Sequence, residues 1–286
     1  MTNATHIWIV SDGKPGHLNQ SLGLAEALQR KIPNLIWQVV PIMSACQAAK
    51  YAWQHKKIQS LPKFILSTGH HTHITLLIFA KIMQVPAIVL MRPSLPVSWF
   101  DLCIIPQHDA PLARYNIIES IGPLNRMQPE KKEADSKLIL IGGPSKHFAW
   151  DDQQMFTQVE NIIQQDNGHW TIATSRRTPL KIVTSLHALA NVTVVLASET
   201  DANWLPSMLA KTENCWVTQD SMSMIYEALT AGCSVKLLAV PYRHKNRLIL
   251  GIEKLQVAGY LGAVDSSLMK LAEADRCAGI IQQRFL

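Results

Sequence analysis

The sequence predicts an α/β protein of two domains, each built around a doubly wound parallel sheet. Short apolar, β-branched runs alternate with segments of helical period along the chain, and one polar stretch interrupts the pattern near its middle. The 286 residues are enough for two domains of about 140 residues each. Ligands of such sheets bind at the carboxyl ends of the strands, so we look for site residues there.

The first domain is expected to span residues 1–126. Its apolar, β-branched runs predict strands at residues 6–11, 35–40, 64–67, 87–91, 102–105 and 116–121. The segments between these runs have apolar residues at helical spacing and predict helices at residues 18–30, 44–55 and 73–83.

Residues 127–137 lie in the polar stretch, lack apolar periodicity and are expected to form a linker. The alternating pattern restarts in a second domain, residues 138–286. Its strands are expected at residues 138–141, 170–174, 193–196, 215–218 and 235–240. Its helices are expected at residues 152–165, 179–190, 204–210, 221–231, 245–258 and 267–283.

The composition is that of a globular protein, with 48% hydrophobic and 17% charged residues. The first residues contain no basic leader, and no apolar run reaches the length of about 18 residues needed to span a membrane. The five cysteines are scattered and form no C-x-x-C pair. We therefore expect a cytoplasmic protein with reduced thiols.

The basic excess lies in the first half of the chain. Residues 1–137 contain 14 Lys and Arg against 8 Asp and Glu, whereas residues 138–286 contain 13 of each. This asymmetry indicates an anionic acceptor or peripheral contact with an anionic membrane at its inner face. An ordinary solvated basic surface remains the alternative, because the cations form no polybasic run, and we expect no nucleic-acid partner.

The loop after the first strand contains two glycines, which allow a ligand to approach the backbone closely. It leads into an amphipathic helix whose first N–H groups favour anions, but it matches neither the G-x-G-x-x-G nor the P-loop pattern. His17 is the candidate general base and Asp12 the other candidate, although loop histidines often serve only as hydrogen-bonding residues. The acceptor-side residues expected in this loop are Gly13, Gly16, Asn19 and Gln20.

The second domain opens with a strand that ends in Gly142-Gly143-Pro144-Ser145-Lys146. Such a turn can wrap a diphosphate with backbone N–H groups while Lys146 offsets its charge, although an ordinary turn has similar residues. The next strand ends in Ser175-Arg176-Arg177, which places two more cations at a carboxyl end. Both turns are therefore predicted to contact the donor diphosphate.

The helix predicted from residue 221 gives the strongest indication of a ligand site in this sequence. Ser223 and Glu227 are four residues apart and share a face, so the carboxylate can accept both hydroxyls of a ribose. Asp220 or Ser221 is expected to cap this helix, which is also the structural alternative for these residues. Residues 241–247 follow the next strand and concentrate hydrogen-bond donors. The donor-contacting candidates among them are His244, Asn246 and Arg247.

These motifs together resemble the "mitochondrial fission, elongated mitochondria" family. The resemblance rests on Asp12-Gly13-x-x-Gly16-x-x-Asn19-Gln20, Gly142-Gly143-Pro144-Ser145, Ser175-Arg176-Arg177-Thr178-Pro179, and the segments 220–228 and 100–109. Bacterial members are regarded as GT-B glycosyltransferases, in which two Rossmann-like domains face a cleft. The resemblance implies transfer of a sugar from a nucleotide-sugar, expected to be UDP-linked, to an acceptor hydroxyl without a metal or another cofactor.

A more distant likeness is to MurG-like N-acetylglucosaminyltransferases of peptidoglycan synthesis. In those enzymes a Gly-Gly-Ser turn opens the donor domain, a helix glutamate holds the ribose, and a His-Lys-x-Arg segment lies beside the donor. Here the turn at 142–145, Glu227 and the segment 244–247 match in kind, and Gly16-His17 matches the first loop. The glutamine pair that reads the donor sugar is absent after Arg247, where Leu248 and Ile249 stand, so the likeness does not imply which sugar is donated. By analogy, it implies a lipid-linked or cell-envelope glycan as acceptor.

Two alternatives remain open. Plant members of the resembled family help to recruit a fission factor to an organelle surface, so a non-catalytic scaffold is the first, and it would need an exposed docking patch. A metal-dependent hydrolase that uses His70, His71 and His73 is the second, but adjacent histidines without a carboxylate rarely converge on one ion. We expect no metal site, and a structural or acceptor-contacting role for His70.

Overall fold

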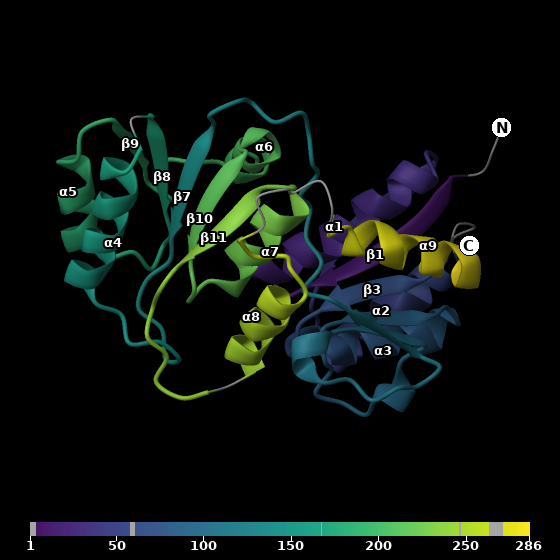
Figure 1. Cartoon of the computed structure of the whole chain (residues 1–286). Helices are drawn as coiled ribbons and strands as arrows, with labels where there is room; N and C mark the ends of the chain where they lie inside the picture. The colour runs from purple at the N-terminus through teal and green to yellow at the C-terminus, as the bar shows by residue number, and fades with distance from the viewer. Residues whose placement is uncertain (1–3, 58–60, 167, 246, 263–270) are drawn as a thin grey trace. The chain divides into compact units, whose positions relative to one another are not determined.

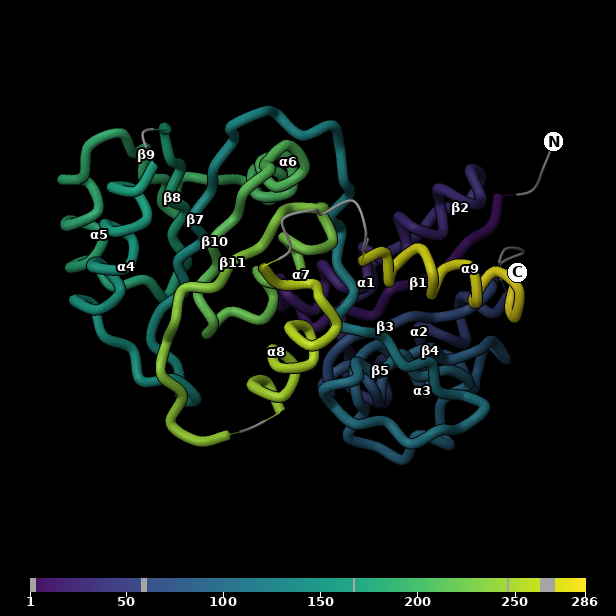
Figure 2. Tube along the Cα trace, viewed as in Figure 1, coloured from purple at the N-terminus to yellow at the C-terminus, as the bar shows by residue number. Residues whose placement is uncertain are grey.

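The computed structural model describes residues 4–57, 61–166, 168–245, 247–262 and 271–286 (Figures 1 and 2). The chain divides into two compact units, which we describe separately. Unit 1 contains Met1–Arg126 and Ala272–Leu286, and unit 2 contains Met127–Leu271. All strand pairs in both sheets are parallel, which confirms the predicted class of two doubly wound α/β domains.

Unit 1 contains strands β1 (Thr5–Ser11), β2 (Leu35–Pro41), β3 (Ile65–Thr68), β4 (Ala87–Leu90), β5 (Leu102–Pro106) and β6 (Ile117–Ser120). Its helices are α1 (Pro15–Lys31), α2 (Ala45–Lys56), α3 (His73–Met83) and α9 (Glu273–Phe285). Short 3-10 turns lie at His70–Thr72, Val97–Trp99 and Gln107–Asp109. The sheet order is β2-β1-β3-β4-β5-β6.

The two faces of the unit 1 sheet are covered by different helices. Ile7 and Ile9 of β1 pack with α1 and α9, whereas Trp8 and Val10 pack with α2 and α3. This alternation follows from the two-residue period of a strand. The central strands β3, β4 and β5 are buried on both faces and consist mostly of apolar residues, which made them predictable from the sequence.

Unit 2 contains strands β7 (Lys137–Ile141), β8 (Trp170–Thr174), β9 (Val192–Val195), β10 (Asn214–Thr218) and β11 (Ser234–Leu238). Its helices are α4 (Asp152–Gln164), α5 (Leu180–His187), α6 (Trp204–Lys211), α7 (Met222–Thr230) and α8 (Arg247–Val257). The sheet order is β11-β10-β7-β8-β9. Helices α4 and α5 cover one face, and α6 and α7 cover the other (Figure 1).

Each sheet has one point at which the strand order reverses. In unit 1 it lies between β1 and β3, and in unit 2 between β7 and β10. The loops that leave neighbouring strands at such a point diverge to opposite faces and open a crevice at the carboxyl edge, where ligands of these sheets bind. The predicted binding loops follow these four strands, so the topology brings each half of the candidate site to a switch point.

The C-terminal helix lies in unit 1, although the sequence-based boundaries placed it in the second domain. Cys277, Ala278 and Ile281 of α9 are buried in the same core as α1. Glu273 accepts a hydrogen bond from the backbone N–H of Ile121 at 2.9 Å. An amphipathic helix packs wherever a matching apolar face is free, and its sequence does not state which sheet provides that face.

Residues 127–137 are part of unit 2 and not a free linker. The Lys132 ammonium donates hydrogen bonds to the carbonyl oxygens of Leu209 at 3.0 Å, Ala210 at 2.9 Å and Ala231 at 2.6 Å. These carbonyls belong to the last turns of α6 and α7, where a cation also complements the helix dipoles. One lysine therefore attaches the segment to two helix ends.

None of the described helices is both long enough and apolar enough to cross a bilayer.

Candidate functional site

The glycine turn after β7 meets the end of β10 at the switch point of unit 2. The N–H of Gly142 donates to Thr218 Oγ1 at 2.8 Å, and the N–H of Gly143 donates to Asp220 Oδ2 at 3.1 Å. A side chain at Gly142 would collide with the Asp220 carboxylate, so the close approach requires glycine. Diphosphate binding by these two N–H groups stays a prediction, and it would require their present acceptors to move.

Arg177 connects the turn after β8 to the same point. Its Nη2 lies 2.7 Å from Asp220 Oδ2, and its Nη1 donates to the carbonyl of Gly143 at 2.7 Å. The Asp220 side chain is fully buried, whereas 41% of the Arg177 side chain is exposed. A buried carboxylate needs such a partner, and the exposed part of the guanidinium remains available to a ligand anion.

The predicted capping of α7 is wrong. Ser221 occupies the N-cap position without a side-chain capping bond, and the Asp220 carboxylate points to Gly143 and Arg177 instead. The first N–H groups of α7 are therefore not satisfied by a cap. They form a positive helix end beside the switch point, the usual arrangement for binding a phosphate group.

Glu227 lies in the second turn of α7, on the same face as the exposed Ser223. Burial raises the pKa of Glu227 to about 7. Its carboxylate makes no hydrogen bond or ion pair with any part of the chain that the structure describes. A half-buried carboxyl group with free acceptor oxygens can bind ligand hydroxyls, as the ribose prediction requires.

The segment after β11 lies beside the glycine turn. Tyr242 pairs with Phe148, and the N–H of Arg243 donates to the carbonyl of His147 at 2.9 Å. His147 and Phe148 directly follow Lys146, so the structure brings the two predicted donor-contacting segments together. Lys146, His244 and Arg247 are exposed, and Asn246 lies outside the described residues.

The other predicted residues of this half have different surroundings. Ser175 Oγ donates to the carbonyl of Gly142 at 2.9 Å, which makes it part of the junction between β7 and β8. Ser145 Oγ is buried and lacks a partner within the described part of the chain. Arg176 is exposed, and with residues of β7, β8 and β9 it lines a small pocket at the carboxyl edge of the sheet.

Asp12 and His17 form a carboxylate–imidazole pair at the switch point of unit 1. His17 Nδ1 lies 3.1 Å from Asp12 Oδ1 and 3.0 Å from Oδ2. Burial opposes ionisation of Asp12, but hydrogen bonds from the Lys14 N–H and the His17 ring outweigh it and lower the pKa of Asp12. An ionised carboxylate only accepts, so in the neutral form of the ring Nδ1 carries the hydrogen and Nε2 has the lone pair that can accept a proton.

Gly69 lies against the ring of His17, a contact that the sequence did not predict. It follows β3, has φ 95°, and a side chain there would collide with the His17 ring. The neighbouring Thr68 is bonded through Oγ1 to Ser21 Oγ of α1 at 2.8 Å. The signal available in the sequence was a glycine directly after a buried strand, which is typical of a close approach to the backbone.

The residues predicted to lie on the acceptor side come from the loop after β1, the start of α1 and the turn after β3. Gly13 has φ 77° and donates its N–H to Ser11 Oγ at 3.1 Å, Gly16 is exposed, and Asn19 and Gln20 are half-buried in the first turns of α1. His70 begins the 3-10 turn after β3 and is exposed.

The three histidines after β3 have different surroundings. The His70 and His71 rings lie 3.9 Å apart between centroids, whereas His73 is buried with Nδ1 at 3.3 Å from Ser94 Oγ. Burial, together with the nearby His70, lowers the pKa of His73. Within the described ranges, no three His, Cys, Asp or Glu side chains form a group that could hold a metal ion.

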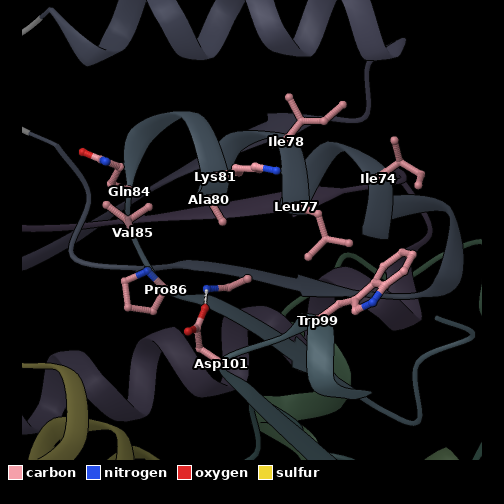
Figure 3. A pocket seen from close by; sticks show the side chains of 11 residues that line it. Ile74, Leu77, Ile78, Ala80, Lys81, Gln84, Val85, Pro86, Trp99 and Asp101 are labelled. Carbon is pink, nitrogen blue, oxygen red and sulfur yellow. Dashed lines mark hydrogen bonds between the residues drawn. The ribbon is translucent and has the colours of Figure 1, made fainter. Parts of the chain in front are cut away.

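Helix α3 borders an open apolar groove in unit 1, with a volume of about 750 Å³ (Figure 3). Ile74 and Trp99 lie at one end, 51% and 57% exposed, and Gln84 lies at the other. Asp101 accepts a hydrogen bond from the N–H of Ala87 at the base of the groove. Besides α3, the groove is lined by residues at the start of β4 and just before β5.

The family model for "Mitochondrial fission ELM1" matches residues 15–285. The chain belongs to the mitochondrial fission ELM1 family. The resemblance predicted from the motifs is confirmed. The ELM1-family chain is also similar to the uncharacterized protein RP120 of Rickettsia prowazekii (strain Madrid E), with 24% identity over 87% of this chain and 88% of that protein.

Solved structures with a similar fold include enzymes of nucleotide-sugar chemistry. The UDP-GlcNAc 2-epimerase from Methanocaldococcus jannaschii has a TM-score of 0.60 and 10% identity, covering 98% of this chain and 100% of that one. UGT71G1 from Medicago truncatula, complexed with UDP-glucose, has a TM-score of 0.51 and 9% identity, covering 98% and 89%. These likenesses show that the ELM1-family chain has the GT-B-like fold of glycosyltransferases and nucleotide-sugar epimerases.

Proposed function

We propose that this ELM1-family protein is a glycosyltransferase that moves a sugar from a nucleotide-sugar to an acceptor hydroxyl. The observation that carries the proposal is the uncapped N-terminus of α7 at the switch point of unit 2. Arg177 is bound to Asp220 just before this helix and provides a cation for the diphosphate. Glu227 lies in the second turn of the helix and provides a carboxylate for the hydroxyl groups of the nucleoside. The similar fold of enzymes that act on UDP-sugars supports this reading.

The donor is held by unit 2 in this proposal. The diphosphate binds the N–H groups of α7 and Arg177, with Lys146 as a further cation, and Glu227 accepts the ribose hydroxyls beside Ser223. The helix end and the cations stabilise the charge that develops on the departing diphosphate, so the proposal requires no metal ion. UDP is the nucleotide that we expect.

The acceptor is activated by unit 1. Asp12 holds the His17 ring so that Nε2 takes the proton of the acceptor hydroxyl. The acceptor oxygen forms a bond to the anomeric carbon of the donor sugar. The bond between that carbon and the diphosphate oxygen breaks, and the nucleoside diphosphate leaves with the bonding electrons.

A lipid-linked glycan is the acceptor that the surface of unit 1 supports best. The apolar groove along α3 can take a hydrocarbon chain. Unit 1 contains 13 Lys and Arg against 7 Asp and Glu, whereas unit 2 contains 14 of each. A basic unit with an apolar groove is suited to the cytoplasmic face of an anionic membrane.

Non-catalytic recruitment is the second candidate function. The same groove is the exposed apolar patch that a scaffold would need, with half of the Ile74 side chain and more than half of the Trp99 side chain exposed. A scaffold does not require a nucleotide. Nucleotide binding therefore distinguishes the two functions.

Calorimetric titration of the full-length protein with UDP, GDP, ADP and CDP, together with a thermal-shift screen of the corresponding sugars, tests the donor half. We expect one nucleotide class to bind and stabilise, with at least a tenfold loss of affinity in Glu227→Ala and Arg177→Met. His17→Ala is the matched control, because it lies in unit 1 and should bind the nucleotide as tightly as the wild type. Absence of binding by every nucleotide would favour the scaffold.

Sedimentation with vesicles tests the membrane step. We expect the protein to sediment with phosphatidylglycerol vesicles and not with phosphatidylcholine vesicles, and we expect Trp99→Asp to abolish this binding. Trp53→Asp is the control, because Trp53 of α2 is 58% exposed and lies outside the groove. Equal losses in both variants would mean that the groove has no special role.

A further inference from the structure

A small pocket lies at the carboxyl edge of the unit 2 sheet, next to the switch point. Its volume is about 250 Å³, less than the roughly 300–1,000 Å³ of a site that holds a whole drug-sized ligand. The ends of β7, β8 and β9 and the first turns of α6 and α7 surround it. The pocket therefore has room for one part of a nucleotide-sugar and not for the whole molecule.

Carbon atoms form most of the wall. Ala173, Val195, Trp204, Leu205 and Met224 line the pocket. Walls of this kind suit the faces of a flat aromatic ring, which can stack on Trp204 or contact the Met224 thioether. A hexose has a hydroxyl group on most of its ring carbons, and it would leave those groups without partners against such a wall.

The hydroxyl groups that line the pocket are already bonded inside the protein. Thr174 Oγ1 accepts the N–H of Ala197 at 3.2 Å, Ser175 Oγ donates to Gly142 at 2.9 Å, and Thr200 Oγ1 donates to Ala197 at 3.3 Å. Among the described lining residues only Arg176 is charged, and it makes no ion pair with another described residue. A ligand in the pocket would therefore contact apolar walls and one group of N–H donors, those of Arg176.

The position of Met224 links this pocket to the proposed ribose site. Met224 and Glu227 are three residues apart on α7, and side chains at that spacing are neighbours, about 5–6 Å apart at Cβ. Because Met224 also lines the pocket, the pocket adjoins the proposed ribose site, and a ribose bound by Glu227 can place its attached base in it. The proposed function places the diphosphate at the N-terminus of the same helix.

We infer that this pocket binds the base of the donor nucleotide and that Arg176 selects bases with carbonyl oxygens at their edge, uracil or guanine, over adenine. The inference rests on the proposed transferase function and reassigns Arg176 from the diphosphate to the base. A guanidinium has only donors, so it pairs well with carbonyl oxygens and is mismatched with the exocyclic amine of adenine. Arg177, which is bound to Asp220, remains the diphosphate cation.

Calorimetry of the full-length protein with UDP, GDP, ADP and inorganic pyrophosphate tests the role of Arg176. We expect Arg176→Met to weaken UDP or GDP about 10- to 100-fold, the range for loss of a good bidentate pair, with less than a twofold change for ADP and pyrophosphate. Lys181→Met, an exposed cation of α5 outside the pocket, should change none of them. Comparison of UDP with GDP identifies which base is preferred.

The position of the base is tested separately by NMR of the protein labelled with ¹³C at the methionine methyl groups. The Met224 methyl signal, assigned with Met224→Leu, should shift with the preferred nucleotide and not with pyrophosphate or ribose 5-phosphate. If Arg176→Met weakens UDP, ADP and pyrophosphate equally, or if a nucleotide binds without moving this signal, the pocket is not the base site. If no nucleotide binds at all, the transferase proposal itself fails.

Discussion

The two units contain the same kind of sheet and the same kind of switch point, but they pair their buried carboxylates differently. In unit 1, Asp12 is paired with the His17 imidazole. In unit 2, Asp220 is paired with the Arg177 guanidinium and a backbone N–H. An imidazole can exchange a proton near neutral pH, whereas a guanidinium stays charged. The proposed function uses this difference, because it assigns proton transfer to unit 1 and binding of the anionic donor to unit 2.

The largest effect is expected when His17 is replaced, and this change tests whether unit 1 transfers a proton. Loss of a general base reduces turnover by about 10²–10⁴-fold, so His17→Ala should reduce the rate of nucleoside diphosphate release by this amount at saturating donor. Nucleotide affinity should stay unchanged, because the donor residues lie in unit 2. Asp12→Asn should act in the same direction, since it removes the charge that orients the ring. An unchanged rate in His17→Ala would show that unit 1 has no base at this position.

The next effect concerns the contact between Gly69 and His17. In Gly69→Ala the added methyl group occupies the place of the His17 ring, and a displaced catalytic group can cost about 10²-fold in rate. Gly262→Ala is the matched control, because Gly262 also has positive φ, has no atom within 4 Å of an added Cβ and belongs to neither half of the candidate site. Both variants should lose about 1–2 kcal/mol of stability from left-handed backbone strain. Only Gly69→Ala should lose turnover beyond that, as measured in parallel rate and denaturation experiments.

The stability of unit 2 is expected to depend on the contacts of Lys132 with the ends of two helices. The described part of unit 1 has no equivalent contact. Lys132→Met removes a cation that binds three carbonyl oxygens, and we expect the free energy of unfolding of unit 2 to fall by about 1–3 kcal/mol. Hydrogen exchange should accelerate at the ends of α6 and α7 and stay unchanged in α1 and α9. Lys131→Met replaces the exposed neighbour and should leave exchange as it is. Equal acceleration in both units would mean that Lys132 does not act locally.

The smallest effect concerns the pH dependence of Glu227. Its pKa of about 7 means that the carboxyl group is mostly protonated at pH 6 and mostly ionised at pH 8. Ribose hydroxyls donate best to the ionised form, so nucleotide affinity should rise by about tenfold between these pH values. Calorimetry should also show proton release on binding below pH 7. In Glu227→Gln the rise should disappear, and a rise that persists would assign the titration to another group.

The sequence by itself determined the number of domains, the class of both sheets and the loops that carry the candidate site. These properties depend on local patterns: strands buried on both faces are continuous apolar runs, and a glycine-containing loop after such a run lies at the carboxyl edge of a parallel sheet. For this reason the sequence alone predicted three candidate site residues, His17, Arg177 and Glu227. Each of them lies a short distance in sequence from the end of a strand or the start of a helix.

Only the tertiary structure decided which side chains these residues meet. Asp220 binds Arg177 and leaves α7 uncapped, Gly69 packs against the His17 ring, and Lys132 attaches the expected linker to unit 2. Helix α9 packs in unit 1, although the residues that precede it in sequence belong to unit 2. Each of these contacts joins residues that are many positions apart, and side-chain patterns of period 2 or 3.6 carry no information about partners at such separations.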